Sequence, residues 1–355
     1  MKIVTVIGNR PQFVKAAAVS GPLRSEHDEV LVHTGQHYDD DLSTIFVHEL
    51  GMPRPEVQLG LGGGTNTAQT ARMLAALGGL LATERPDAVL VYGDTNSTLA
   101  GALAAAQAQI PVVHVEAGMR SFDRAMPEEL NRVLTDHAAD LLLVPSQGAA
   151  DNLAREGVAG EVQVVGDVMV DVARLLAPRA LADDEPLRRA GVSAGAFLLA
   201  TAHRAGTVDD RDRLEELVKL LLGFDLPVVL PLHPRTRARL HDAGLLERLS
   251  AGVIVLAPLG YLAFTSLLTR ARAVLTDSGG VQKEAYLAGV PCLTLRDSTE
   301  WVETVQHGWN VLVDLDAGAA RAALERPRPH ARPQLYGDGH ASERIAASLT
   351  ANLPR

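Results

Sequence analysis

Short apolar runs bounded by turn-forming residues alternate with amphipathic stretches along the first half of the chain. The apolar runs predict buried strands at residues 3–7, 30–33, 88–92, 112–115, 141–144 and 162–165. The stretches between them predict helices at residues 13–23, 68–83, 98–108, 129–138 and 149–156. Strict alternation of this kind indicates a parallel sheet with right-handed crossovers.

A second series of the same kind follows an interruption. Residues 177–194 are polar and contain Pro178, so we expect an irregular linker there. Further strands are predicted at residues 197–200, 228–230, 253–256, 273–275, 292–295 and 311–313. The fold class is therefore α/β, with two Rossmann-like parallel-sheet domains at 1–176 and 177–338. We expect the last amphipathic segment, 339–355, to pack back on the first domain.

Composition narrows the possible partners. The chain has 355 residues, of which 47% are hydrophobic and only 4% aromatic, so the core is built from Ala, Leu and Val. With 33 basic and 43 acidic residues, the net charge of −10 argues against nucleic acid and anionic membrane as partners. A single cysteine, Cys292, excludes an internal disulfide and a multi-cysteine zinc site.

The first residues, MKIVTVIGNRP, predict a strand and not a signal peptide, because the apolar run is short and lacks a cleavage site of small residues. The chain has no apolar run near the roughly 18 residues of a membrane span. We therefore expect a cytoplasmic protein.

Polar residues follow the predicted strands of the first half, where parallel sheets bind ligands. Arg10 and Lys15 come after the first strand, Asp94 after the third and Glu116 after the fourth. A carboxylate directly after a buried strand is costly unless it is paired or used. Asp94 is as well explained by helix capping as by catalysis at this point.

The fourth predicted helix, 129–138, starts at the acids Glu128 and Glu129, which are followed by Arg132. Acids in a first turn favour the helix dipole, which is the simplest account of both. Arg132 is spaced to pair with Glu128 on the helix surface. The first strand is not followed by GxGxxG, and the glycine-rich residues 59–67 have no P-loop lysine, which makes NAD and Walker-type sites improbable.

In the second half, the segment from Thr276 to Pro291 predicts a strand end, a tight turn and a helix. Asp277 and Ser278 offer capping oxygens, and Gly279-Gly280 leaves the first N–H groups of the helix open to a phosphate. Glu284, one turn later, is placed to accept hydrogen bonds from ribose hydroxyls. An ordinary strand-to-helix turn is the alternative for the motif by itself.

Two histidines, His203 and His233, also follow apolar strands directly. One such histidine is usually a core residue, but two at the same sheet edge as the glycine turn suggest a site.

The motifs, in chain order, resemble those of the non-hydrolysing UDP-N-acetylglucosamine 2-epimerases. They are GNRPQFVKAA, HTGQHY, YGDTNST, HVEAGMRSF, MPEELNR, DSGGVQKEA, TEWVETVQHGWN and LYGDGHASERI. The resemblance implies a GT-B fold with the active site in the interdomain cleft, a homodimer, a UDP-sugar substrate, and no cofactor or metal.

The same resemblance implies which residues line the site. As catalytic groups it implies Asp94, Glu116, Glu128, His203 and Lys15. As groups that bind UDP and sugar it implies Arg10, Arg132, His233, Ser278, Gly279, Gly280 and Glu284.

Three positions depart from the family pattern. Gln12 stands where Glu is frequent, Trp301 where Arg is, and residues 205–207 lack the acid and amide that often follow His-Arg. Gln12 and Trp301 resemble a sub-branch that includes epimerases of UDP-2,3-diacetamido-glucuronic acid. The implied reaction is inversion at carbon 2, by elimination of UDP to 2-acetamidoglucal and re-addition. A retaining glycosyltransferase and a non-catalytic nucleotide-sugar sensor are the alternatives.

Overall fold

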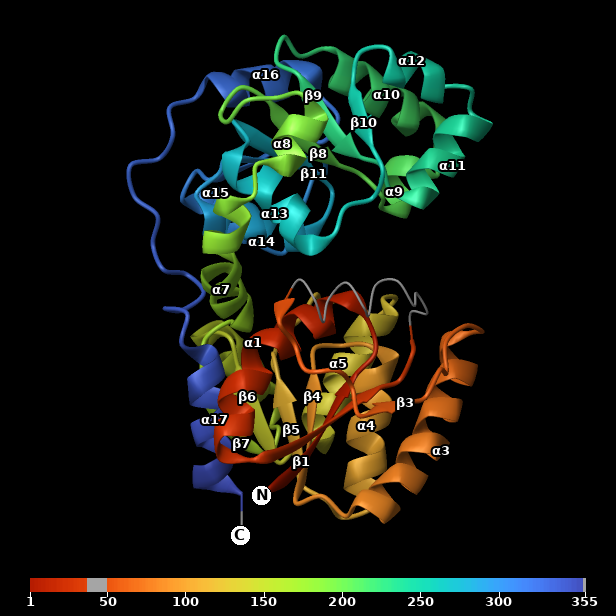
Figure 1. Cartoon of the computed structure of the whole chain (residues 1–355), viewed down its shortest axis with the longest axis vertical. Coiled ribbons are helices and arrows are strands. Elements are labelled where there is room, and N and C mark those ends of the chain that lie inside the picture. Colours follow the sequence, from red (N-terminus) through yellow and green to blue (C-terminus); the bar gives the residue numbers. More distant parts are fainter. Residues whose placement is uncertain (37–49, 354–355) are drawn as a thin grey trace. The chain divides into compact units, whose positions relative to one another are not determined.

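The computed structural model describes residues 1–36 and 50–353 of the chain. These residues divide into two compact units, one made of Met1–Leu175 with Tyr336–Arg355 and the other of Leu176–Leu335. His37 and Tyr38, in the HTGQHY motif, lie outside the described residues. Figure 1 shows the α/β character of each unit, and the predicted class with two parallel sheets is confirmed.

The first unit contains a seven-stranded parallel sheet in the order β3-β2-β1-β4-β5-β6-β7. Its strands are β1 (Lys2–Ile7), β2 (Asp28–His33), β3 (Val57–Gln58), β4 (Ala88–Tyr92), β5 (Val112–Val115), β6 (Leu141–Val144) and β7 (Glu161–Val164). The strands β4, β5 and β6 have the predicted bounds, because a strand buried on both faces is a continuous apolar run. Two-residue β3 was not predicted.

The helices that follow these strands are α1 (Arg10–Glu26), α3 (Asn66–Glu84), α4 (Asn96–Gln107), α5 (Pro127–Ala138) and α6 (Gln147–Glu156). Side-chain caps explain where several begin: the Asn9 side chain accepts from the backbone N–H of Gln12, and Thr95 and Thr98 form a capping box. Helix α4 is rich in alanine and is buried almost throughout, so it packs closely on the sheet.

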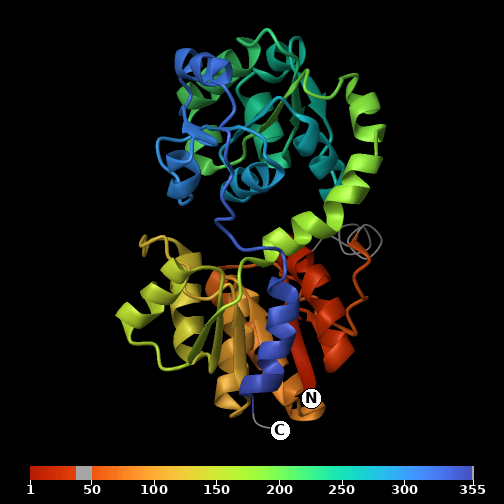
Figure 2. The ribbon, with the colours of Figure 1, turned by 90° about the vertical axis from the view of Figure 1, so that its left-hand side faces the viewer.

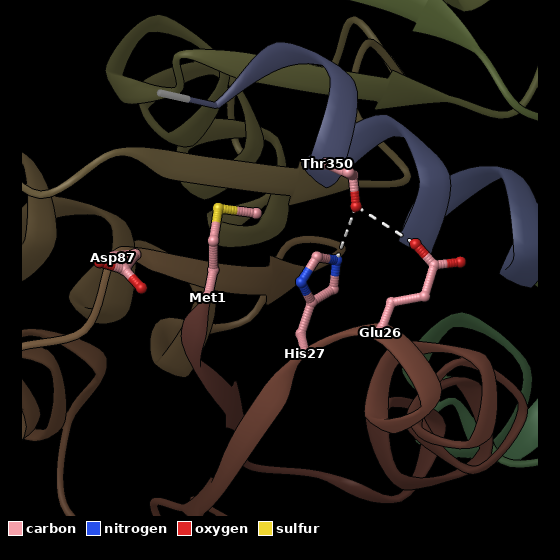
Figure 3. Close-up of a pocket in the computed structure, with 5 residues that line it drawn as sticks. All are labelled: Met1, Glu26, His27, Asp87 and Thr350. Carbon is pink, nitrogen blue, oxygen red and sulfur yellow. Dashed lines mark hydrogen bonds between the residues drawn. The ribbon is translucent and has the colours of Figure 1, made fainter. Parts of the chain in front are cut away.

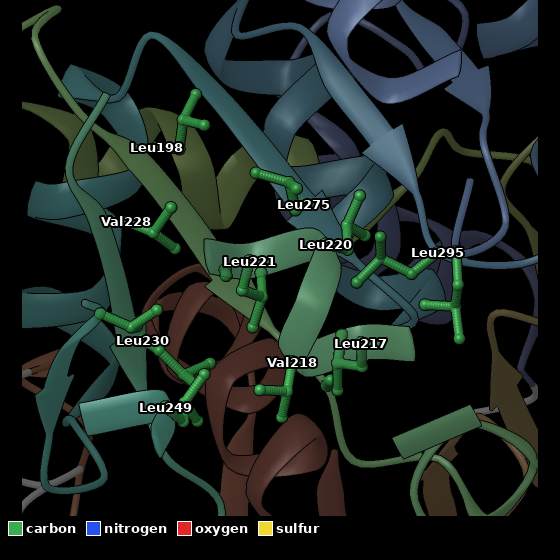
Figure 4. Close-up of a cluster of buried hydrophobic side chains, with 14 of the residues drawn as sticks. Leu198, Leu217, Val218, Leu220, Leu221, Val228, Leu230, Leu249, Leu275 and Leu295 are labelled. Carbon is green, nitrogen blue, oxygen red and sulfur yellow. The ribbon is translucent and has the colours of Figure 1, made fainter. Parts of the chain in front are cut away.

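The second unit contains a six-stranded parallel sheet in the order β10-β9-β8-β11-β12-β13. Its strands are β8 (Leu198–Thr201), β9 (Val228–Pro231), β10 (Ile254–Leu256), β11 (Ala273–Thr276), β12 (Cys292–Thr294) and β13 (Asn310–Leu312). Its helices include α8 (Glu185–Ala190), α9 (Ala205–Val208), α10 (Arg211–Leu222), α11 (Pro234–Asp242), α12 (Leu246–Ser250), α13 (Tyr261–Arg270), α14 (Gly279–Ala288), α15 (Val302–Gln306) and α16 (Ala317–Glu325). Figure 4 shows leucines and valines of α10 meeting those of the sheet in one buried cluster.

The predicted irregular linker at residues 177–194 was wrong. Helix α7 (Val168–Ala182) runs through Pro178, and α8 follows after a two-residue gap. The apolar positions of α7 continue past the proline, and both Leu176 and Ala180 are buried. Their burial outweighs the hydrogen bond that Pro178 cannot donate.

Helix α17 (Ala341–Asn352) belongs to the first unit, although the whole second unit separates it from β7 in sequence. It packs against α1, and Figures 1 and 2 both show the two helices side by side. The buried carboxylate of Asp171 accepts hydrogen bonds from the backbone of Ala341 and from both the backbone and the hydroxyl of Ser342. These bonds satisfy free N–H groups at the start of α17.

Among the described residues, no helix combines the length and the hydropathy needed to cross a membrane.

Candidate active site

Each sheet has a point at which the strand order reverses. In the first unit it lies between β1 and β4, and in the second between β8 and β11. Loops diverge from such a point at the carboxyl ends of the strands, and ligands of open α/β sheets bind there. The residues that follow these strands, Arg10, Asp94, His203 and Ser278, are all ones that the sequence singled out.

In the first unit, Lys15 and Glu116 form an ion pair between their side chains. Lys15 lies on α1, and Glu116 lies on the turn after β5 with a left-handed φ of 70°. A Cβ on Gly93 would lie 3.3 Å from the Glu116 carboxylate, so the β4 turn passes close to this pair. A cavity of about 10 Å³, enough for one water molecule, borders Lys15 and Glu116.

Asp94 is paired with a different cation, Arg132 of α5. Asn131 of the same helix donates to the backbone carbonyl of Asp94 at 3.0 Å, which fixes the turn. Burial raises the pKa of Asp94 and the charge of Glu116 raises it further, against the opposing effects of Arg132 and Lys15. The four side chains therefore form one electrostatically coupled group, in which Asp94 holds a proton more readily than an ordinary aspartate.

Glu128 is not joined to this group. It is exposed on the first turn of α5, and no hydrogen bond or ion pair links its side chain to another described residue. The predicted surface pair between Glu128 and Arg132 was wrong, because Arg132 points to Asp94 and, at 3.3 Å, to Glu129. A catalytic role for Glu128 stays a prediction.

Gln12, the first departure from the family pattern, is buried beneath the β1 and β4 turns. Its carbonyl accepts from the backbone of Gly8 at 2.7 Å, and its amide donates to the Tyr92 carbonyl at 2.7 Å. The same amide lies 3.0 Å from the Thr95 hydroxyl and 2.9 Å from that of Thr98. Gln12 thus ties together the two loops that carry Arg10 and Asp94. Arg10 itself begins α1.

In the second unit, Ser278 is the N-cap residue of α14, and the helix ends at Gly289 in a left-handed cap. A Cβ on Gly279 would overlap the Glu300 carboxylate, so that side chain packs directly on the glycine. Trp301 donates from its indole to the Gly279 carbonyl at 2.8 Å. The turn therefore has the predicted position, and Glu300 and Trp301, which follow β12, pack directly against it.

The predicted side-chain caps of α14 were wrong: Ser278 occupies the N-cap position but makes no capping hydrogen bond with its side chain, and neither does Asp277. Its buried carboxylate accepts from the backbone of His203 and of Arg204, each at 2.9 Å, and so braces the turn after β8. The His203 and His233 rings stack with centroids 5.2 Å apart. Burial lowers the pKa of His233, and the neighbouring charges of His203 and Arg235 lower it further, which favours a neutral ring.

Two further cations lie beside the glycine turn. Arg296 donates to Glu300 at 2.9 Å, and Arg204 lies 3.5 Å from the same carboxylate. The sequence analysis assigned no role to Arg204, Arg296 or Glu300. All three follow predicted strands, and this position could have identified them. Glu284 lies one turn into α14 and is half-buried.

A larger pocket of about 360 Å³ lies at the amino ends of the strands of the first sheet, opposite to the candidate residues of that unit. Figure 3 shows its lining of Met1, Glu26, His27, Asp87 and Thr350. None of the candidate residues belongs to it. Within the part of the chain that the structure describes, no cluster of three or more His, Cys, Asp or Glu side chains is suited to hold a metal ion.

These features place the protein in the class of α/β proteins that bind nucleotides: polar side chains lie at the strand-order reversal of each parallel sheet, and the second unit adds a glycine-rich helix start. Comparison with known proteins is more specific. Residues 23–350 match the family model of UDP-N-acetylglucosamine 2-epimerase, and the chain belongs to that family.

Among its relatives, the UDP-2,3-diacetamido-2,3-dideoxy-D-glucuronate 2-epimerase of Pseudomonas aeruginosa is 49% identical over 98% of this chain and 99% of its own. A crystal structure of Methanocaldococcus jannaschii UDP-GlcNAc 2-epimerase in complex with UDP-GlcNAc and UDP superposes with a TM-score of 0.88, at 40% identity, covering 99% of this chain and 100% of that one. The UDP-GlcNAc-bound enzyme of Neisseria meningitidis superposes with a TM-score of 0.87 at 27% identity, covering 99% and 100%.

Proposed function

We propose that this protein interconverts UDP-N-acetylglucosamine and UDP-N-acetylmannosamine by inverting carbon 2 of the sugar, without hydrolysis. The observation that carries the proposal is the pairing of two carboxylates, Asp94 after β4 and Glu116 after β5, with separate cations. Inversion requires proton transfer on both faces of one carbon, and therefore two acid/base groups held in different states. Family membership and the UDP-GlcNAc complexes of the structural relatives support the same assignment.

The hydrogen on carbon 2 has no neighbouring carbonyl to acidify it, so direct removal is difficult. In the proposed reaction the bond from carbon 1 to the UDP oxygen breaks and the proton on carbon 2 is removed, which gives 2-acetamidoglucal and UDP. A proton then adds to the other face of carbon 2 while the UDP oxygen attacks carbon 1. Atoms and charge balance, and the reaction needs no cofactor.

The proposed UDP-binding residues have different chemical roles. Ser278, Gly279 and Gly280 offer the N–H groups of α14 to the diphosphate, since a helix start attracts anions. Arg10 and His203 add donors for the leaving group, and a well-aimed donor of this kind is typically worth about 3–4 kcal/mol. Glu284 is proposed to bind the ribose, and His233 to support His203 by stacking.

Asp94, Glu116 and Glu128 are the proposed acid/base groups, with Lys15 and Arg132 setting the charge of the first two. The raised pKa of Asp94 makes it the better candidate to deliver a proton. Glu116, paired with Lys15, is then the better candidate to remove one.

Incubation with UDP-N-acetylglucosamine in heavy water tests the proposal. We expect proton NMR to show deuterium on carbon 2 and a mixture of the two epimers. No acceptor for a sugar transfer is present in the incubation. A glycosyltransferase would leave carbon 2 protonated, and a sensor would bind UDP without exchange. Asp94→Asn and Glu116→Gln should each lower kcat strongly. Their affinity for UDP, measured by calorimetry, should stay unchanged. Near-native rates in both variants would refute the assignment.

A second substrate is favoured by the arginines beside the glycine turn. UDP-2,3-diacetamido-2,3-dideoxy-glucuronate carries a carboxylate on its sugar, and Arg204 and Arg296 already bind one carboxylate, that of Glu300. The 49% identical relative is named for this sugar. The ratio of the kcat/KM values for the two UDP-sugars decides between them. We expect Arg204→Gln and Arg296→Gln to lower kcat/KM for the glucuronate and to leave kcat/KM for UDP-N-acetylglucosamine unchanged.

We further propose a homodimer that works in the cytoplasm. The single cysteine, buried Cys292, suits a reducing compartment because the fold depends on no disulfide. Light scattering after size exclusion should give twice the mass of the 37.7 kDa chain, and a mass of one chain would refute the dimer.

A further inference from the structure

His114 is a buried titratable residue that has no role in the proposed reaction. It lies on β5 and is fully buried. Its Nδ1 is 2.7 Å from a carboxylate oxygen of Asp136, and its Nε2 is 2.7 Å from the carbonyl oxygen of Gly93. A neutral imidazole has a single N–H and can satisfy only one of two such acceptors.

Asp136 acts as an acceptor toward all its neighbours. Its carboxylate receives the Arg120 guanidinium at 2.7 Å and the backbone N–H of Gly118 at 3.2 Å. Burial by itself would raise the pKa of Asp136, but the hydrogen bonds and charges of His114 and Arg120 outweigh it and lower that pKa. An ionised Asp136 has no proton to offer, so Nδ1 of His114 must donate. The Gly93 carbonyl has none either, so Nε2 must donate as well.

We propose that His114 is held as a doubly protonated imidazolium between Asp136 and the Gly93 carbonyl, and that it is a positioning residue for the carboxylates of Asp94 and Glu116. The inference rests on the proposed function for its catalytic part. Its structural part rests only on the hydrogen bonds of the first unit.

The route from His114 to Asp94 is short. Gly93 has a φ of 63°, and its N–H donates to the Val115 carbonyl at 3.0 Å, so the β4 turn is already held on one side. The Nε2–H of His114 holds the carbonyl of the peptide that joins Gly93 to Asp94. Asn131 then holds the carbonyl of Asp94 itself. Loss of the middle contact frees that peptide to rotate.

The route to Glu116 is equally direct. His114 lies on β5, two residues before Glu116 on the turn that follows, and Asp136 binds the N–H of Gly118 on the far side of that turn. One charged ring therefore joins the β4 turn to the β5 turn. Two of the three proposed acid/base groups, Asp94 and Glu116, lie on these turns, and proton transfer tolerates little displacement.

The charges around the ring are balanced, as a buried charge requires. Arg120 binds Asp136 and also both oxygens of Glu156 on α6, at 2.8 Å and 2.6 Å, and His137 lies 4.0 Å from Glu156. Nearby charged groups on the adjoining turns and helices are also paired: Lys15 with Glu116, and Arg132 with both Asp94 and Glu129.

The protonation is tested on the full-length protein without substrate. With ring-¹⁵N-labelled histidine at pH 7.5, we expect one histidine whose two nitrogens both show the shift and the directly bonded proton of N–H. That signal should be absent from the His114→Gln spectrum. A single N–H on His114, in either tautomer, would overturn the inference.

The positioning role is tested by a matched pair of variants. His114→Gln keeps an N–H donor near the Gly93 carbonyl, whereas His114→Asn keeps one near Asp136 only. We expect kcat to fall about 100-fold in His114→Asn, the usual effect of a misplaced group, with KM little changed and a clearly smaller loss in His114→Gln. Equal losses in kcat, or lower thermal stability with unchanged kcat in both, would overturn the role.

If His114→Asn does not fold, Asp136→Asn replaces it. This variant keeps an oxygen acceptor but removes the negative charge, so we expect the ring to lose one N–H signal and kcat to fall. Retention of both signals and of native kcat overturns the inference. Failure of the wild type to exchange deuterium at carbon 2 would refute the proposed function alone, since the ring spectrum still decides the protonation.

Discussion

The buried amide of Gln12 offers the sharpest test of the first unit. Gln12→Glu changes one NH2 group into oxygen and leaves the size of the side chain unchanged. The carbonyl oxygen that accepts from Gly8 is retained. The other end now presents an oxygen to the Tyr92 carbonyl, across the 2.7 Å that the amide bridged.

The hydroxyls beside Gln12 can offset only part of this change. Thr98 donates to the Tyr92 carbonyl at 2.6 Å, so turning its hydroxyl toward the new carboxylate leaves that carbonyl unsatisfied. An unsatisfied buried group costs about 1–3 kcal/mol, and an unpaired charge costs more. We expect Gln12→Glu to lower the free energy of unfolding by about 3 kcal/mol at pH 7.

The cost should depend on pH. The new carboxyl regains a donor for the Tyr92 carbonyl when it is protonated, so its pKa is raised in the folded state. A raised pKa means that stability is near wild type below the ordinary carboxyl pKa and is lost as pH rises, by at most about 1.4 kcal/mol per pH unit. Gln12→Met removes the bond from Gly8 as well as those of the amide, but adds no charge, so it should be destabilised equally at pH 5 and pH 8.

Urea unfolding followed by circular dichroism measures these losses. Both tryptophans of the chain, Trp301 and Trp309, lie in the second unit, so their fluorescence reports that unit separately. We expect its midpoint to stay unchanged in both variants. Wild-type stability of Gln12→Glu at pH 8, or the same loss at pH 5 and pH 8, would refute the reasoning.

Three further results are expected. Gly118→Ala and Gly157→Ala both place a side chain at positive φ, 74° and 68°, but only the former meets a backbone carbonyl of α6, so thermal melts should show it less stable by a further ~1–3 kcal/mol; equal melts would contradict this. Arg132→Gln removes a cation that lowers the pKa of Asp94, so the alkaline limb of the kcat/KM profile, where a proton donor is lost, should move to higher pH, and an unmoved limb would exclude Asp94 as that donor. Burial raises the pKa of the Cys292 thiol to about 12, so a disulfide reagent should label it only after unfolding, and rapid labelling of the native protein would show that the site opens.

The strands were predictable because burial on both faces of a parallel sheet leaves a continuous apolar run, as in β4 and β11. Two errors came from local rules that tertiary packing overrides. Pro178 was interpreted as a helix breaker, although the buried Leu176 and Ala180 hold α7 together around it. Asp277 was interpreted as a cap of its own helix, although it binds the backbone of the neighbouring β8 turn.

In the candidate site, only the positions of residues that closely follow a strand in sequence were predictable. A polar residue directly after a buried strand must lie at the binding edge of the sheet, and this rule found Asp94 and Glu116. Which cation each carboxylate binds depends on distant segments, since Arg132 lies 38 positions from Asp94. For the same reason the hydrogen bonds of His114 were invisible in sequence, where it looked like one more residue of an apolar strand.

The attachment of α17 has a consequence for how the protein is made. The first unit takes its last helix from residues that the ribosome adds only after the complete second unit. Until then the apolar face of α1 that α17 covers is open, and the Asp171 carboxylate lacks the N–H groups of residues 341 and 342. The second unit, continuous in sequence, can finish folding first. A nascent chain can therefore have a complete second unit while its first unit still lacks α17.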